Sequence, residues 1–205
     1  MDLKRFAAAF GAAMLGTAFM GVSLAQAADP IRLRGTVVSL DGSTLTMKTR
    51  DGATDAVTLA AGWKISGVAK ASVGDIKAGD FVGVVSVPKA DGGGGALEVV
   101  IFPAALRGTG EGDRPWDLQP NSRMTNGTID NPVTGVDGRT VTLSYNGQQK
   151  KITIPDQTPI VTVASATAED LKPGAPVFVT VQRSSDGGLS SNRVVVGNNG
   201  IAPPM

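Results

Sequence analysis

An internal repeat is the feature of this 205-residue chain that most restricts its fold. The segment 35–42 is echoed by 127–138, the segment 75–79 by 170–174, and the segment 98–101 by 193–196. Most of the matched stretches keep an offset of 95 or 96 residues. Chance similarity between turns does not hold register over such a length, so the pattern indicates the duplication of a whole unit of about 75 residues.

Each copy of the unit has the sequence pattern of β-structure. The segments 44–48 and 140–144 alternate polar and apolar residues with period two, as half-buried strands do. Asp-Gly or Asn-Gly dipeptides, which accept the positive φ of tight hairpins, mark the expected strand ends. Between the third and fourth strands, Thr167 and Asp170 resemble a helix N-cap with its acidic partner, and Gly174 a helix stop. The order is three strands, one helical turn, then two strands.

This order predicts an all-β protein made of two tandem, small, OB-like five-stranded barrels, each with one short helical turn. An immunoglobulin-like sandwich is the alternative, but it needs about seven strands, and each copy has room for five or six. The predicted division is a first barrel over 28–103, an ordered Gly/Pro-rich linker over 104–123, a second barrel over 124–197 and a tail over 198–205. The Pro-rich end of the tail is interpreted as frayed rather than as a docking peptide.

Residues 1–27 are typical of a secretory signal peptide. Lys4 and Arg5 precede an uncharged run over 6–24, and the A-x-A pattern at 25–27 predicts cleavage before Ala28. A transmembrane anchor is the alternative, but it needs about 20 strongly apolar residues, and small or hydroxyl-bearing residues dilute this run. We therefore expect a periplasmic or secreted protein with no stable membrane insertion after cleavage.

The chain contains neither Cys nor His, which excludes many kinds of functional site. Ser–His–Asp triads, cysteine nucleophiles and thiolate or imidazole metal sites all require these residues. The three glutamates, Glu98, Glu111 and Glu169, form no recognisable acid pair. We therefore predict no catalytic residues, no metal and no cofactor, with a carboxylate-based hydrolase as the remaining enzymatic alternative. After cleavage 17 basic and 17 acidic residues remain, so nucleic acid is not an expected partner.

Two tryptophans lie in the segments most suited to ligand binding. In the linker, Arg114, Trp116 and Asp117 combine an indole with charges that stack on a sugar or bind a carboxylate. The alternative is that Trp116 fills the junction between the barrels while Arg114 pairs with Asp117 or Glu111. Trp63 has no aromatic counterpart in the second copy, so a residue covering the barrel rim is favoured over a ligand platform.

Together with the linker 107–120 (RGTGEGDRPWDLQP), the repeat resembles a group of exported bacterial proteins whose barrels resemble the family called domain of unknown function 5666. The resemblance implies an exported tandem-barrel protein and supplies no reaction. We predict a non-catalytic binding module of the cell envelope, with a small ligand or glycan bound at a barrel face or at the inter-barrel junction. The alternative is a structural adaptor that contacts another envelope protein.

Overall fold

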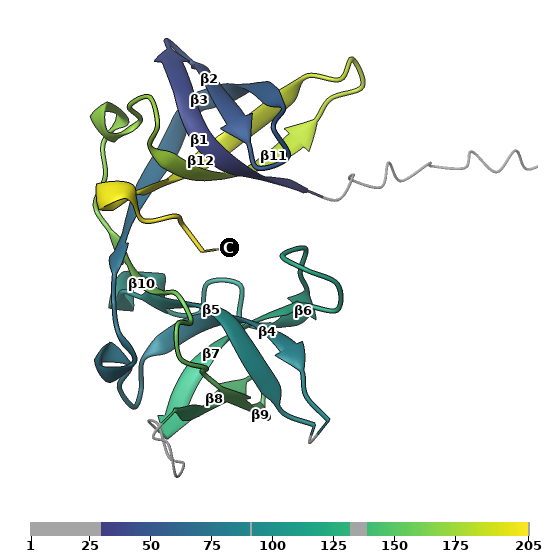
Figure 1. The fold of residues 1–205 in the computed structure, drawn as a ribbon, viewed down its shortest axis with the longest axis vertical. Coiled ribbons are helices and arrows are strands. Elements are labelled where there is room, and N and C mark those ends of the chain that lie inside the picture. Colours follow the sequence, from purple (N-terminus) through teal and green to yellow (C-terminus); the bar gives the residue numbers. More distant parts are fainter. Residues whose placement is uncertain (1–29, 91, 132–138, 205) are drawn as a thin grey trace, which may run out of the picture.

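The computed structural model of the chain describes residues 30–90, 92–131 and 139–204, and the predicted signal peptide at 1–27 lies outside them (Figure 1). The described residues form strands joined by loops and short 3-10 turns, which confirms the all-β prediction. Within these ranges no helix is long and apolar enough to cross a bilayer.

Five strands close into a barrel: β1 (Ile31–Asp41), β2 (Thr44–Thr49), β3 (Thr54–Lys70), β11 (Pro176–Arg183) and β12 (Leu189–Gly197). The β1–β2 hairpin turns at Gly42, whose φ of 54° suits glycine. The alternation predicted for β2 places Leu45 and Met47 in the barrel core, where both are fully buried. β12 runs parallel to β3 and so completes the ring.

The other strands form a second sheet, which consists of β4 (Phe81–Pro88), β5 (Gly94–Phe102), β7 (Arg123–Asn131), β8 (Thr140–Tyr145) and β9 (Gln148–Thr153). Its two edge strands, β5 and β9, meet only at Gly94 and Gly95, which pair with Ile152 and Thr153. The short strand β6 (Gly112–Pro115) lies in the ordered linker and pairs with β7. The strand β10 (Ile160–Ala164) lies between β5 and β3 and joins the second sheet to the barrel.

The strand pairing contradicts the predicted division into barrels over 28–103 and 124–197. β11 and β12, from the predicted second copy, pair with β1 and β3 of the predicted first copy. β4, from the first copy, pairs with β7 of the second. Each half of the molecule is therefore built from three strands of one copy and two strands of the other.

The long strand β3 explains this exchange. It spans 17 residues, or roughly 55 Å at a rise of about 3.3 Å per residue, and it continues beyond the barrel. Its last residues pair antiparallel with β10, and Val68 lies opposite Val163, which stands 95 residues later in the sequence. Because β3 leaves the barrel and β10 leads the chain back, each following pair of strands joins the opposite half (Figure 1).

The predicted helical turns are present as single 3-10 turns, η1 (Val73–Asp75) and η3 (Ala168–Asp170). The cap predicted for η3 is present, because the Asp170 carboxylate accepts the Thr167 N–H at 2.7 Å, and η1 has the same kind of cap, in which the Asp75 carboxylate accepts the Ser72 N–H at 2.8 Å. Gly174 follows with a φ of 87°.

The interpretation of the C-terminal end as frayed is wrong. After β12 the chain forms a 3-10 turn, η4 (Asn198–Gly200), and then runs between the barrel and the second sheet (Figure 1). Pro203 and Pro204 are both buried there. The physical reason is packing against both halves: Ala202 and Pro203 lie beside barrel residues such as Val177, and Pro204 lies beside residues that lead into β10.

Candidate functional site

A cluster of apolar side chains lies where β3 and β10 join the barrel to the second sheet. Its buried members are Val68, Val100, Val161, Phe178 and Val195. Trp116, from the linker after β6, packs against this cluster and is half-buried. This contact supports the packing interpretation of Trp116 over the ligand interpretation.

Two guanidinium groups lie over the Trp116 ring. The Arg32 guanidinium carbon is 3.9 Å from the ring centroid, and that of Arg114 is 5.5 Å away. Burial, and then repulsion from Arg32, lowers the pKa of Arg114. Because arginines cover the indole, it is not an open platform for a sugar. Its Nε1 atom is buried without a hydrogen-bond acceptor among the described residues.

Asp117 connects the linker to the barrel. Its Oδ1 accepts a hydrogen bond from Arg34 Nη2 at 2.8 Å, and its Oδ2 lies 3.8 Å from Arg32 Nη1. Burial raises the pKa of Asp117, but the hydrogen bond from Arg34 and the charges of both arginines lower it below its usual range overall.

The structure thus brings Arg114, Trp116 and Asp117 together, but the predicted pairing of Arg114 with Asp117 or Glu111 is wrong. Arg114 Nη1 instead donates to the carbonyl oxygen of Gly110 at 2.8 Å. A Glu111 carboxylate oxygen accepts the backbone N–H of Asn146 at 3.0 Å.

Sequence reasoning missed the two β1 arginines that complete this group. Arg32 and Arg34 alternate with Ile31 and Leu33, both of which pack against the barrel core. Strand alternation therefore places both arginines on the outer face, toward the junction. That alternation was the signal that would have identified them.

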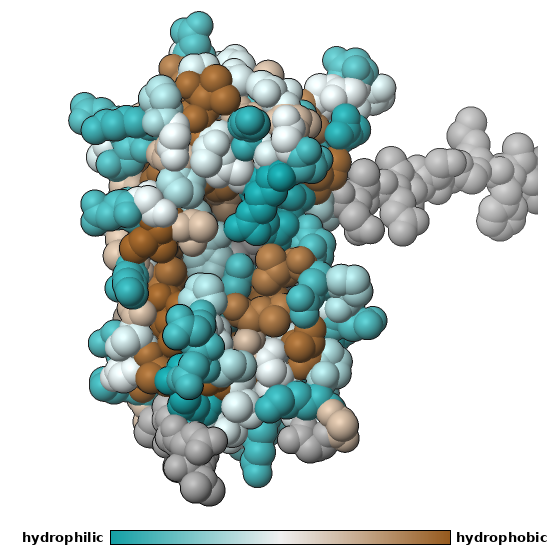
Figure 2. All heavy atoms as spheres, viewed as in Figure 1, coloured by the Kyte–Doolittle hydropathy of each residue, from teal (hydrophilic) through white to brown (hydrophobic). Residues whose placement is uncertain are grey.

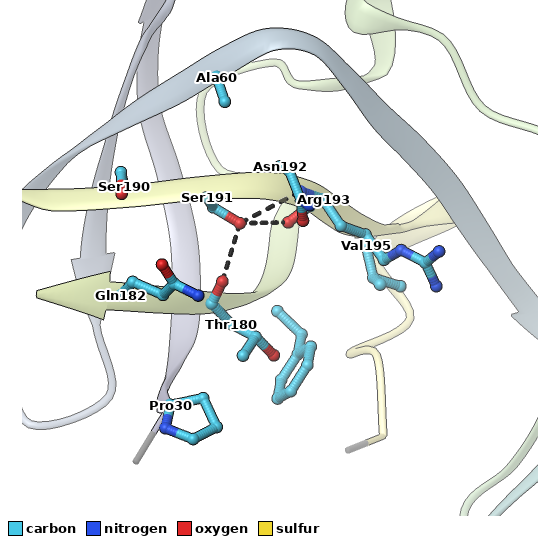
Figure 3. Close-up of a pocket in the computed structure, with 10 residues that line it drawn as sticks. Pro30, Ala60, Thr180, Gln182, Ser190, Ser191, Asn192, Arg193 and Val195 are labelled. Carbon is cyan, nitrogen blue, oxygen red and sulfur yellow. Dashed lines mark hydrogen bonds between the residues drawn. The ribbon is translucent and has the colours of Figure 1, made fainter. Parts of the chain in front are cut away.

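A concave pocket lies beside this junction, on the outer face of the barrel (Figure 3). Its volume is about 480 Å³, and the buried side chains of Phe178 and Val195 contribute apolar surface to it. Polar side chains supply most of the remaining lining, namely Thr180, Gln182, Ser190, Ser191, Asn192 and Arg193. The Arg34 guanidinium carbon, 5.2 Å from the centre of the Phe178 ring, connects the pocket to the junction.

Two irregularities in strand pairing create the pocket. The register of β11 against β12 shifts between Val179 and Gln182, and that of β12 against β3 shifts between Ser191 and Arg193. The buried Ser191 hydroxyl lies 2.8 Å from the Thr180 carbonyl oxygen and accepts the Arg193 N–H at 3.2 Å (Figure 3). The Ser191 hydroxyl thus takes the place of a backbone hydrogen-bond partner that these groups lack at the bulge. The side chains of Gln182, Asn192 and Arg193 remain exposed.

Arg193 is the charged group of this pocket. Its side chain makes no hydrogen bond and no ion pair with any residue in the described ranges, and Figure 3 shows it extending away from β12. Figure 2 shows hydrophilic and hydrophobic side chains mixed over this face of the molecule, with a group of hydrophobic residues just below its middle. A partnerless guanidinium beside apolar surface is suited to bind an anionic group.

The structure places Trp63 away from these residues. It lies where β3 bulges out of register with β12, and it packs, half-buried, against the barrel core. It therefore belongs to the barrel wall and does not join Trp116. Among the residues described, no group of three or more Asp, Glu, His or Cys side chains is placed to hold a metal ion.

Comparison of the chain with known proteins found no matching family model, no matching curated protein and no matching solved structure.

Proposed function

We propose that this protein is a non-catalytic binding module that holds an acidic glycan in the pocket between β11 and β12. The observation that carries the proposal is the exposed Arg193 guanidinium, which has no partner among the described residues and lines a pocket of about 480 Å³. Apolar surface from Phe178 and Val195 suits the apolar face of a sugar ring, and hydroxyl and amide side chains suit its hydroxyl groups.

The charge of the lining narrows the ligand class. No acidic residue lines the pocket, whereas the Arg193 guanidinium does and the Arg34 guanidinium stacks on Phe178. A guanidinium binds a carboxylate through two parallel hydrogen bonds, so a sugar carrying a carboxylate fits better than a neutral sugar. None of the lining residues is an acid, a lysine or a tyrosine that would serve as a general base, which supports binding without catalysis.

The proposal extends to the architecture and the location of the protein. We propose that the second sheet, like the barrel, is an OB-like five-stranded barrel and that a duplicated unit gave rise to both. Corresponding strand pairings support this, because β5 pairs with β9 and β10 at positions 95 residues before or after those of β12 and β3. We propose that residues 1–27 are cleaved as a signal peptide and that the mature chain, from Ala28, works in the periplasm or outside the cell.

Thermal unfolding of the mature chain with glycans tests the binding function. A uronic-acid oligosaccharide at about 100 times its Kd is expected to stabilise the protein by about 2.7 kcal/mol. For a chain of this size that is a shift in Tm of roughly 5–11 °C. The neutral oligosaccharide of the same length is expected to give a much smaller shift, because it lacks the carboxylate.

Arg193→Ala is expected to lose most of the shift. The matched control is Arg183→Ala, which removes an exposed arginine from the end of β11 that does not line the pocket. An equal Tm shift in the parent and in Arg193→Ala would reject the pocket as the binding site. An equal shift with the neutral oligosaccharide would reject an acidic glycan as the ligand.

A further inference from the structure

The C-terminal tail, residues 198–204, is held between the barrel and the second sheet by a tight turn (Figure 1). The turn has positive φ values at Asn199 and Gly200, 53° and 77°. A Cβ atom at Gly197 would lie 1.6 Å from the Ile201 carbonyl oxygen, so only glycine lets the chain fold back there. The turn directs the two following prolines into the gap between the halves.

Two cavities flank the tail, and we call them together the tail groove. The smaller, about 290 Å³, is lined by Ala202 and Pro203 of the tail together with residues of β1, the end of β2 and the start of β11, among them Thr36. The larger, about 490 Å³, adjoins Ile201, Ala202 and Pro204 and is lined mainly by the segment 157–161, which leads into β10, with Lys70 at the end of β3 and Glu98 of β5. Cavities thus adjoin the tail on the side of the barrel and on the side of the second sheet.

Packing rather than hydrogen bonding holds the tail in this groove. Within the described part of the tail, the backbone hydrogen bond outside regular strands runs from the Ile201 N–H to the Asn198 carbonyl oxygen, inside the turn itself. Pro203 and Pro204 have no N–H group to donate, yet both are buried. Recognition of this kind depends on an extended shape that proline stabilises before binding.

We propose that the tail groove is a recognition site for an extended Pro-Pro segment of another polypeptide, and that the protein's own tail is its resident competitor. The seated Pro203 and Pro204 show which chemistry the groove accepts, and the cavities beside them leave room for a longer segment. A tethered tail acts at an effective concentration in the millimolar range, so a partner segment must exceed that or carry further contacts.

A peptide-binding assay on the full mature chain tests this proposal. The probe is a fluorescein-labelled peptide with the sequence of residues 199–204, followed by anisotropy. The double variant Pro203→Gly/Pro204→Gly weakens the resident tail without altering the groove wall, and circular dichroism melts check that it folds. It is expected to bind the probe at least ~10-fold more tightly than the parent chain does. A probe with alanine in place of both prolines is expected to bind at least ~10-fold more weakly.

A pair of β1 variants locates the binding. Thr36 is exposed and lines the smaller cavity, so Thr36→Trp added to the double variant is expected to abolish probe binding. Val38 is exposed two residues farther along β1 and does not line either cavity, so Val38→Trp is expected to leave binding unchanged. Equal binding by these two variants overturns the proposal, and so does equal affinity for the proline and alanine probes.

A second measurement applies if the double variant does not fold. The chain has no cysteine, so Ala202→Cys provides a unique site for an environment-sensitive dye on an exposed tail position. Millimolar unlabelled Pro-Pro peptide is expected to displace the tail and shift the dye emission toward that of the denatured chain. An emission spectrum that the peptide leaves unchanged up to about 10 mM overturns the proposal, since that concentration exceeds the effective concentration of the tail.

Discussion

The barrel and the second sheet are closed by the same kind of parallel strand pair, but the barrel uses one long strand where the second sheet uses two short ones. In the barrel, β12 follows the single strand β3 from Val57 to Val68, interrupted only by a bulge. In the second sheet, β5 pairs first with the end of β9 and then with β10. The segment between β9 and β10 contains Pro155 and Pro159, neither of which has an N–H to donate. Prolines thus divide in one half the strand that is continuous in the other.

The two halves share a bend in the closing strand and differ in how that strand is supported. The chain bends at the same place in both halves, because Gly62 has a φ of 72° and Gln157, 95 residues later, has a φ of 70°. In the second sheet Arg139 supports the divided segment: its Nε donates to the Ile154 carbonyl oxygen at 2.8 Å, and its Nη1 pairs with Asp156 at 2.8 Å. A side chain therefore supplies contacts that a continuous strand makes through its backbone.

Cutting the linker is the strongest test of the exchange that underlies this comparison. A protease site inserted after the exposed Gly108 separates the two sequence copies covalently. Because each half contains strands of both copies, the two fragments are expected to co-elute in size-exclusion chromatography and to separate only in denaturant. If the cut chain releases two folded domains without denaturant, each copy forms its own barrel and the exchange is wrong.

Substitution of two corresponding glycines, Gly35 and Gly127, compares how closely neighbouring strands pack in the two halves. A Cβ at Gly35 would lie 2.0 Å from the Lys48 carbonyl oxygen, and one at Gly127 would lie 2.6 Å from that of Ser144. Gly35→Ala and Gly127→Ala are each expected to lower the free energy of unfolding by about 1–3 kcal/mol, with the larger loss at Gly35. Urea denaturation measures both. Gly74→Ala, where the nearest atom is an ordinary 3.7 Å away, is the control and should change little.

Acid unfolding compares the charge networks of the two halves. Burial raises the pKa of Asp113, but hydrogen bonds from Thr125, Lys150 and Arg123 outweigh it and lower the pKa overall. A lowered folded-state pKa stabilises the protein above the unfolded value, about 3.9, and this contribution is lost as the pH falls through the folded value. Asp113→Asn is expected to cost about 1–3 kcal/mol at pH 7 and to flatten the loss of stability below about pH 4.

The matched variant is Asp117→Asn, at the contact between the linker and the barrel. Its carboxylate is 42% exposed, against 16% for Asp113, so a smaller loss is expected. Urea unfolding at several pH values between 2.5 and 7 measures both variants. If Asp117→Asn lowers the free energy of unfolding more than Asp113→Asn does, the linker's contact with the barrel contributes more stability than the charge network of the second sheet, which would contradict this prediction.

The strands and hairpins of this fold were predictable from sequence because their signals are local. Alternation at 44–48 and the Asp-Gly turn at 41–42 act within a few residues, and so does the Thr167–Asp170 cap. The exchange of strands was not predictable from such signals. The strands β4 and β11 could each pair with the first strand of their own copy or with that of the other copy. Both pairings bury the same apolar residues, so the apolar pattern of the sequence does not distinguish them.

The candidate sites were predictable only in part for the same reason. Trp116 and its charged neighbours Arg114 and Asp117 were identified from the sequence, whereas Arg32 and Arg34 were missed, although the alternation of β1 would have placed them. The pocket beside Arg193 depends on two bulges that the Ser191 hydroxyl supports, and a regular alternation pattern does not encode the position of a bulge. The buried tail packs against residues of both halves that are far apart in the sequence, so no local pattern predicts its burial.

The exchange of strands also sets an order on folding. β1, β2 and β3 are the first part of the barrel to be synthesised, but β11 and β12, which complete it, are among the last. During synthesis, the edges of β1 and β3 therefore have no partner strands until more than a hundred further residues have been made. Such long-range pairing slows folding and favours aggregation of the waiting strands. Chaperones that cover the edges of β1 and β3 are therefore expected to raise the yield of this protein more than that of a chain in which each repeat closes on itself.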